Sequence, residues 1–210
     1  GREDPGWNNI EIRDSRIYLE ALTVDANGFT AGQVPGENAI DTKTHAEAER
    51  ATLIVEDTEV WGFANGMDTS DQSAFFIKEG VDATFRRVTV WDSEIAFRLR
   101  GPPPTRPQGA RVRFVNAVLH DLDVGVRYEQ ELEELTVLFT TFGMNINTFL
   151  AENDSATTSA IMQNNLFVHE EIPSLADESN GNRAVPAEDL VDSDARNHRL
   201  EEGSEAIDAG

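Results

Sequence analysis

Short runs in which apolar and polar residues alternate recur along the chain, and each run ends in a polar turn. Such alternation is typical of β-strands with one buried and one solvated face. One family of runs carries a turn residue at an equivalent position. These turn residues are Asp14, Asp57, Arg87, Asn116, Thr140 and Asn164. They are 43, 30, 29, 24 and 24 residues apart, which indicates stacked solenoid coils with insertions in the first part.

A second family of strands lies between these runs and aligns without gaps. Its members are residues 39–43, 74–78, 96–100 and 125–129. The alternation predicts that the second and fourth residues of each member face the core, so Tyr128 is expected to be buried. Two strand families per turn, stacked in about six coils, predict an all-β fold of the parallel β-helix (solenoid) type.

The last part of the chain loses this period and contains Pro173, Pro186 and many carboxylates. We therefore expect residues 1–172 to form the coils and residues 173–210 to form an irregular C-terminal extension that packs on the helix. An open solenoid end needs such cover, because unpaired strand edges attract other chains. Residues 101–107 are rich in proline, which cannot continue a strand ladder, and predict a rigid loop beside the second strand family.

Three stretches resemble parts of exported bacterial proteins with a single-stranded right-handed parallel β-helix, the pectate-lyase-like class. Residues 200–210 are similar to the ending of such proteins, residues 37–43 resemble one of their coils, and Asn164-Asn165 resembles their turn ladders. The resemblance implies a right-handed helix in a secreted or cell-surface protein. Many such proteins act on acidic polysaccharides and others are surface proteins. We expect the chain, which starts at Gly1, to be a processed piece without its signal peptide.

The charge balance excludes some partners. The chain has 17 Lys and Arg against 39 Asp and Glu, a net charge of −22, so nucleic acid and anionic membrane surfaces should repel it. No apolar run is long enough to cross a bilayer, so we expect no membrane insertion. The absence of cysteine excludes disulfides and thiolate metal sites. We expect a monomer with a solvated surface.

With so few cations, their positions are informative. Those predicted on the outward side of the second strand family are Lys43, Lys78, Arg98, Arg100 and Arg127. Neighbouring strands lie about 4.8 Å apart, so these cations should form a basic strip that accepts an anion. The alternative is a surface salt-bridge network. The carboxylates that would neutralise the strip are Glu37, Asp41, Glu79 and Glu129.

A basic strip could support β-elimination on a uronic-acid polysaccharide. Crowding by other cations lowers the pKa of a lysine, so Lys78 is the predicted base. Arg98 is predicted to assist it by neutralising the sugar carboxylate. The predicted substrate-binding residues are Lys43, Phe76, Arg100 and Arg127, with Phe76 as an outward ring for sugar stacking. These roles resemble the Lys/Arg machinery of polysaccharide lyases with this fold.

Some of those lyases also use Ca²⁺, so the resemblance makes Ca²⁺ a candidate cofactor. Glu37 and Asp41, with Asp68 and Asp71, could supply the oxygen ligands that this cation prefers. Solvated turn carboxylates are the alternative explanation for these residues.

Two other functions stay open from the sequence. One is a non-catalytic surface, adhesion or glycan-binding module that uses the solenoid as a rod. The other is a glycoside hydrolase with paired carboxylates such as Asp41 and Asp68.

The four histidines, His45, His120, His169 and His198, show no ligand spacing, so no zinc site is predicted. His45, near Lys43, is either a proton shuttle or a surface turn residue.

Overall fold

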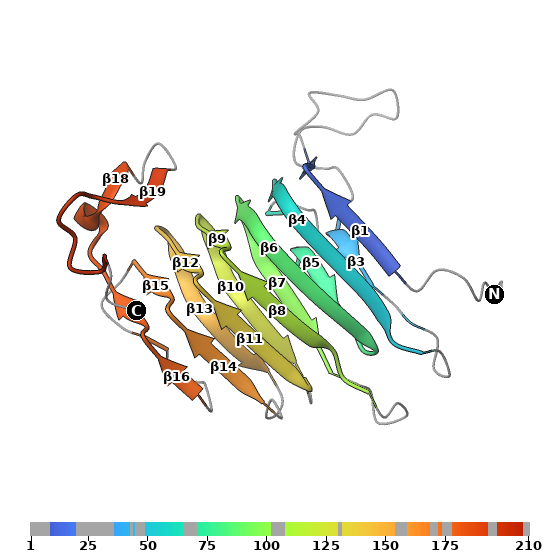
Figure 1. Cartoon of the computed structure of the whole chain (residues 1–210). Helices are drawn as coiled ribbons and strands as arrows, with labels where there is room; N and C mark the ends of the chain where they lie inside the picture. Colours follow the sequence, from blue (N-terminus) through green and yellow to red (C-terminus); the bar gives the residue numbers. More distant parts are fainter. Residues whose placement is uncertain are drawn as a thin grey trace, which may run out of the picture.

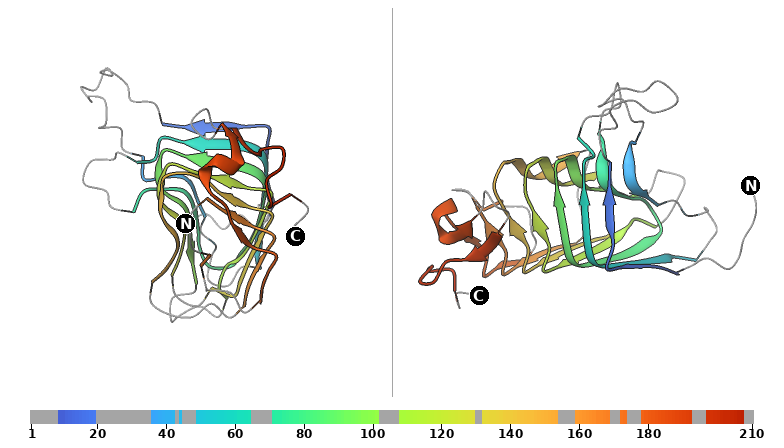
Figure 2. Two further views of the ribbon diagram at one scale, coloured as in Figure 1. Left: turned by 90° about the vertical axis from the view of Figure 1, so that its left-hand side faces the viewer. Right: turned by 90° about the horizontal axis from the view of Figure 1, so that it is seen from above.

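The computed structural model contains mainly β-strands, and most of their pairings are parallel (Figure 1). It describes residues 9–19, 36–42, 44, 49–64, 71–101, 108–129, 132–153, 159–168, 172–173, 178–192 and 197–207. Strands that recur along the chain lie over one another, as Figure 2 (left) shows in a view down the stack. The arrangement is solenoid-like, and we call each passage of the chain through the sheets a rung. No described helix is long and apolar enough to cross a membrane.

The first sheet has two faces that meet at a corner. Its strands are β1 (Asn9–Arg13), β2 (Arg16–Tyr18), β4 (Ala51–Trp61), β6 (Val81–Trp91), β8 (Arg111–Val115), β9 (Val118–Leu119), β11 (Glu134–Leu138), β12 (Thr141–Phe142), β14 (Ala160–Gln163), β15 (Leu166–Phe167), β16 (Glu178–Asn180) and β17 (Arg183–Ala184). Strands β4 and β6 run through the corner, whereas the other strands end or begin there. The first strand family therefore occupies two faces, so each rung has three faces where the sequence predicted two.

A residue with positive φ turns the chain at this corner in every described rung. These residues are Asp14, Asp57, Arg87, Asn116, Phe139, Asn164 and Gly181, with φ between 47° and 65°. Glycine, asparagine and aspartate tolerate this left-handed conformation best. Strand register places the seven residues in one line, so the sheet bends along a ladder of left-handed residues.

Five of the six turn positions predicted for this corner are confirmed, and one is wrong by a single residue. The turn residue is Phe139, not Thr140. Leu138 pairs with the residue before Asn116 and with the residue before Asn164, so Phe139 occupies the corner. Thr140 is buried, and its N–H donates to the Asn165 side chain at 2.8 Å.

The strain at Phe139 leads to a prediction. Its ring is 53 % exposed, so replacing it loses little buried apolar area. Phe139→Asn is expected to raise the free energy of unfolding by about 0.5–1 kcal/mol, because asparagine adopts positive φ more readily than other non-glycine residues. Urea denaturation measures this. Phe139→Ala, which keeps the backbone strain, should show no gain, and an asparagine variant no more stable than the parent would contradict the prediction.

The second sheet forms the third face. Its strands are β3 (Asn38–Asp41), β5 (Ser73–Ile77), β7 (Ser93–Arg100), β10 (Leu122–Glu129) and β13 (Ile146–Asn153). A second ladder of positive-φ residues leads into it from the first sheet, formed by Gly62, Asp92, Asp121 and Asn145. The predicted gap-free register is confirmed, since Ile40, Phe75, Phe97 and Val126 pair in succession. Tyr128 is buried, as predicted.

Stacked phenylalanine rings fill the interior. Phe75 and Phe97 lie 5.1 Å apart between ring centroids with nearly parallel planes, and Phe85 packs edge-on against both at 4.8 Å. Phe114 continues the group on the next rung, 4.3 Å from Phe97. All four rings are buried, so apolar contacts between rungs hold the stack together.

The parallel stacking continues past the boundary predicted at residue 172, because β16 and β17 pair with β14 and β15. A short 3₁₀ turn (Ala187–Asp189) and an antiparallel pair, β18 (Leu190–Asp192) with β19 (Asn197–Leu200), follow. Val168, Val185 and Leu190 form a small apolar cluster there. Residues 102–107 of the predicted proline-rich loop lie outside the described part of the chain.

Candidate functional site

The outward side of the second sheet carries most of the predicted site residues. Asp41, Phe76, Arg98 and Arg127 occupy one register column on β3, β5, β7 and β10. Side chains alternate along each strand, so this column points away from the buried phenylalanines. The strand register therefore brings Arg98 and Arg127 next to each other, as the sequence predicted.

Lys78 follows β5 and forms an ion pair. Its Nζ lies 2.7 Å from the carboxylate of Asp41. The sequence predicted that neighbouring cations crowd this lysine and make it a base. The structure instead places the ammonium against a carboxylate, which removes the argument from cation crowding.

Arg98 and Arg127 share two carboxylates. Nε and Nη2 of Arg98 donate to the two oxygens of Glu129 at 2.9 and 3.3 Å, and Nε of Arg127 lies 3.1 Å from the same carboxylate. Nη1 of Arg127 donates to Asp71, which also lies 3.8 Å from Nη1 of Arg98. Each carboxylate thus contacts both guanidinium groups.

Asp71 is held in place by the rung that follows it. It has a φ of 67° and lies just before β5. The backbone N–H groups of Asp71 and Gln72 donate to the carboxylate of Glu94 at 3.1 and 3.0 Å. Glu94 therefore positions the loop end that presents Asp71 to the two arginines. The sequence offered no signal for this contact, because a loop rather than a strand places Asp71.

Phe76 is covered by two cations. Nζ of Lys78 lies 4.2 Å from the ring centroid, and Cζ of Arg98 lies 4.5 Å from it. Both distances are typical of cation–π contacts. The side chain is only 5 % exposed, so the predicted exposed platform for sugar stacking is wrong. Phe76 instead supports the two cations from beneath.

The structure describes only some of the remaining predicted residues. Arg100 is half-buried and pairs in register with Glu129. Lys43, His45 and Asp68 lie outside the described residues. Glu37 is exposed, and Asp41 is engaged by Lys78. Within the described ranges no three His, Cys, Asp or Glu side chains gather in a way that could hold a metal ion, so a Ca²⁺ site at Glu37 and Asp41 stays a prediction.

Taken together, these contacts match the salt-bridge alternative more closely than an open basic strip. The described ion pairs of this face join Lys78, Arg98 and Arg127 to Asp41, Asp71 and Glu129. The face presents guanidinium and carboxylate groups in alternation. Such planar, charged groups can bind both the carboxylates and the hydroxyls of a sugar chain.

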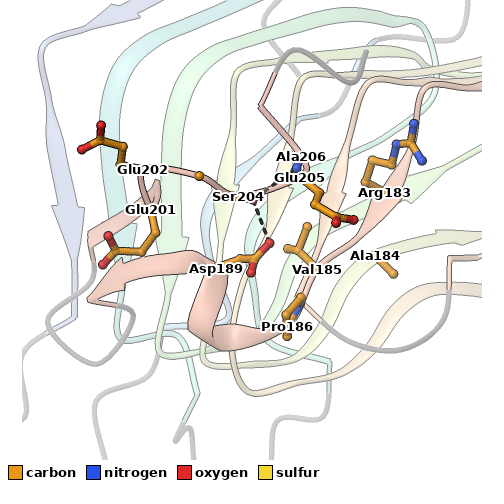
Figure 3. Close-up of a pocket in the computed structure, with 11 residues that line it drawn as sticks. Arg183, Ala184, Val185, Pro186, Asp189, Glu201, Glu202, Ser204, Glu205 and Ala206 are labelled. Atoms are coloured by element: carbon orange, nitrogen blue, oxygen red, sulfur yellow. Dashed lines mark hydrogen bonds between the residues drawn. The ribbon is translucent and has the colours of Figure 1, made fainter.

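A cavity of about 760 Å³ lies in the C-terminal part, between β17 and the residues after β19 (Figure 3). Ser204 Oγ donates to Asp189 at 2.7 Å, and the N–H of Ala206 donates to Ser204 Oγ. Glu201, Glu202 and Glu205 also line it. No histidine is among the described lining residues, so a Ser–His pair is not present in this lining.

Comparison with known proteins finds no matching family model, no matching curated protein and no matching solved structure. Function is therefore inferred from the geometry of the second sheet's outward side.

Proposed function

We propose that the chain is a right-handed parallel β-helix that binds an acidic polysaccharide outside the cell through the outward side of its second sheet. The observation that supports this is the Asp71 carboxylate held by Arg127 and Arg98. A uronate carboxylate has the same charge and planar shape. It can therefore take the place of Asp71 between the two guanidinium groups.

The two carboxylates that contact Arg98 and Arg127 differ in how easily a ligand carboxylate could replace them. The Glu129 side chain is 12 % exposed and is held by both Arg98 and Arg127. The Asp71 side chain is 29 % exposed and comes from a loop end. Glu129 thus fixes the orientation of the arginines, whereas Asp71 occupies the position that a ligand carboxylate would take.

The net charge of −22 opposes the approach of a polyanion. Salt screens this repulsion beyond about 8 Å at physiological ionic strength, whereas direct guanidinium–carboxylate contacts are screened much less. Binding through Arg98 and Arg127 is therefore best at moderate salt, where long-range repulsion is weak and the contacts persist.

A lyase is the second candidate. Lys78 and Arg98 lie over the same Phe76 ring, so the Lys78 amine lies beside the arginines that are proposed to bind the ligand carboxylate. The ion pair between Lys78 and Asp41 makes a non-catalytic binding module the better supported function. Ultraviolet absorbance of the unsaturated uronate product, with and without Ca²⁺, separates the two. Product formed by the parent and lost in Lys78→Met identifies a lyase, whereas binding without product identifies a binding module.

Two variants test the binding site in opposite directions. Asp71→Asn is expected to tighten the binding of polygalacturonate or alginate by roughly 3–10-fold, because the internal competitor loses its charge. Arg127→Met is expected to weaken binding by about tenfold or more, through loss of charge-assisted hydrogen bonds. Affinity electrophoresis and calorimetry measure both.

Arg113→Met is the matched control. Arg113 is an exposed arginine of β8 on the outer side of the first sheet, so its loss changes the net charge equally without touching the site. Equal affinities for the Arg127 and Arg113 variants would show that the outward side of the second sheet is not the binding surface.

A further inference from the structure

Four stacked rings lie where the chain turns from the first sheet into the second, on the side away from the core. Tyr18, Trp61 and Trp91 pair in strand register, and His120 follows on the next rung. Their ring centroids are 4.5, 4.7 and 5.8 Å apart in succession, and the planes tilt by less than 10°. Trp61, Trp91 and His120 each come directly before a left-handed turn residue, so this part of the ladder follows from the repeat.

A ring from the C-terminal segment continues this ladder. On the rung after His120 the equivalent residue is Gly143, which has no side chain to stack. A Cβ at Gly143 would lie 3.0 Å from Cε1 and 3.1 Å from Nδ1 of His198. The imidazole of His198, on β19, therefore occupies the place of the missing side chain. Its ring centroid lies 4.5 Å from that of His120.

The surroundings of His198 favour a neutral imidazole. Both of its ring nitrogens are buried and have no hydrogen-bond partner within the described part of the chain. Burial, and to a smaller extent the neighbouring His120, lower the pKa of His198 to about 4, and Asp121 opposes this shift. Protonation would create a cation that these surroundings do not solvate.

Asp121 is the nearby group that favours a charged His198, but its carboxylate contacts the Nδ1 of His120 at 2.8 Å. On β19 itself the exposed Arg199 comes next, and across the hairpin Asp192 pairs in register with Asn197. Neither ring nitrogen has a hydrogen-bond partner among the described residues, so the cation formed at low pH is better solvated when the imidazole moves out to water.

We propose that His198 is a pH-operated latch, which holds residues 187–192 and 197–207 against the end of the parallel stack while it is neutral and releases them when acid protonates it. Release uncovers His120, Gly143 and the apolar cluster at Val168 and Val185. Figure 1 shows β18 and β19 at the end of the stack opposite β1. The latch therefore controls access to the last rungs.

The direction of the pH effect follows from proton binding. Between about pH 4 and the ordinary pKa of 6.5, the docked state binds fewer protons than the released state. Docking is therefore at full strength above this window and weakens as the pH falls through it. Partial solvent access reduces the effect, so we expect docking to weaken on the order of tenfold between about pH 7.5 and pH 4.5.

Hydrogen–deuterium exchange of the full chain tests the latch, after correction for the intrinsic pH dependence of exchange. In the parent, protection of β18 and β19 should fall at the lower pH relative to β14, because a released two-stranded hairpin is marginally stable. His198→Phe keeps a ring in the ladder without a titrating group, so protection should stay constant. Arg199→Gln, an adjacent charge change, should respond as the parent does.

Two results would overturn the proposal: constant protection of β19 in the parent, or an equal loss in His198→Phe and the parent. If His198→Phe does not fold, His198→Leu decides, because it fills the same place with a smaller side chain that does not titrate. That variant should show the same protection of β19 at both pH values, with a parent-like circular dichroism spectrum. A loss of protection equal to the parent's in His198→Leu would rule the latch out.

Discussion

Replacing Phe97 with alanine is expected to lower the free energy of unfolding by about 3–5 kcal/mol. The Phe97 ring is fully buried and packs against Phe75, Phe85 and Phe114 on the same and adjacent rungs. Its removal leaves a cavity that these rings cannot close, because strand register fixes their positions. Urea denaturation followed by circular dichroism measures the loss.

Phe139→Ala is the matched control, since it removes the same side chain from an exposed site and should change stability by less than about 0.5 kcal/mol. Phe97→Leu should cost less than Phe97→Ala, because it leaves a smaller cavity. If Phe97→Ala and Phe139→Ala had equal effects, stacked interior rings could not be the main source of cohesion between rungs.

The second large effect is expected at Asn165, whose replacement by alanine should cost about 2–4 kcal/mol. Its Oδ1 accepts a hydrogen bond from the Thr140 N–H at 2.8 Å, and its Nδ2 donates to the Val137 carbonyl and to Asn182 Oδ1, each at 2.9 Å. Asn165 is fully buried, so alanine leaves two backbone groups of the preceding rung, the Thr140 N–H and the Val137 carbonyl, without this partner and out of reach of water.

Asn180→Ala is the control, because the side chain of Asn180 is exposed at the same end of the stack. It should be near neutral in thermal and urea unfolding. Hydrogen exchange adds a local readout, since the Thr140 amide should lose protection in Asn165→Ala alone. Unchanged exchange at Thr140 would contradict the role given to the asparagine.

Much of the parallel stacking could be predicted because side-chain alternation allows few registers. Only the observed alignment places Phe75, Phe97 and Val126 together inside, and a one-residue slip would expose all of them. The error at Phe139 has a physical cause. Phenylalanine rarely adopts positive φ, so the adjacent polar Thr140 was the more natural turn residue.

The site was predictable only in part. Alternation predicted that Arg98 and Arg127 lie side by side, but it could not predict their carboxylate partners. Asp71 reaches Arg127 across 56 residues from a loop end, which no strand pattern places. The contact between His120 and His198 was missed for the same reason, since it depends on a C-terminal strand outside the repeat and on the missing side chain of Gly143.

The parallel pairing has a mechanical consequence. Backbone hydrogen bonds between rungs point along the stack, from β1 at one end toward β16 at the other (Figure 1). Tension along that axis loads the bonds of one rung at a time, as in a zipper, rather than shearing many at once. A rung of about 24 residues, as between Asn116, Phe139 and Asn164, adds roughly 80 Å of extended chain when it opens. We therefore expect the stack to lengthen stepwise under tension along this axis while its remaining rungs stay folded.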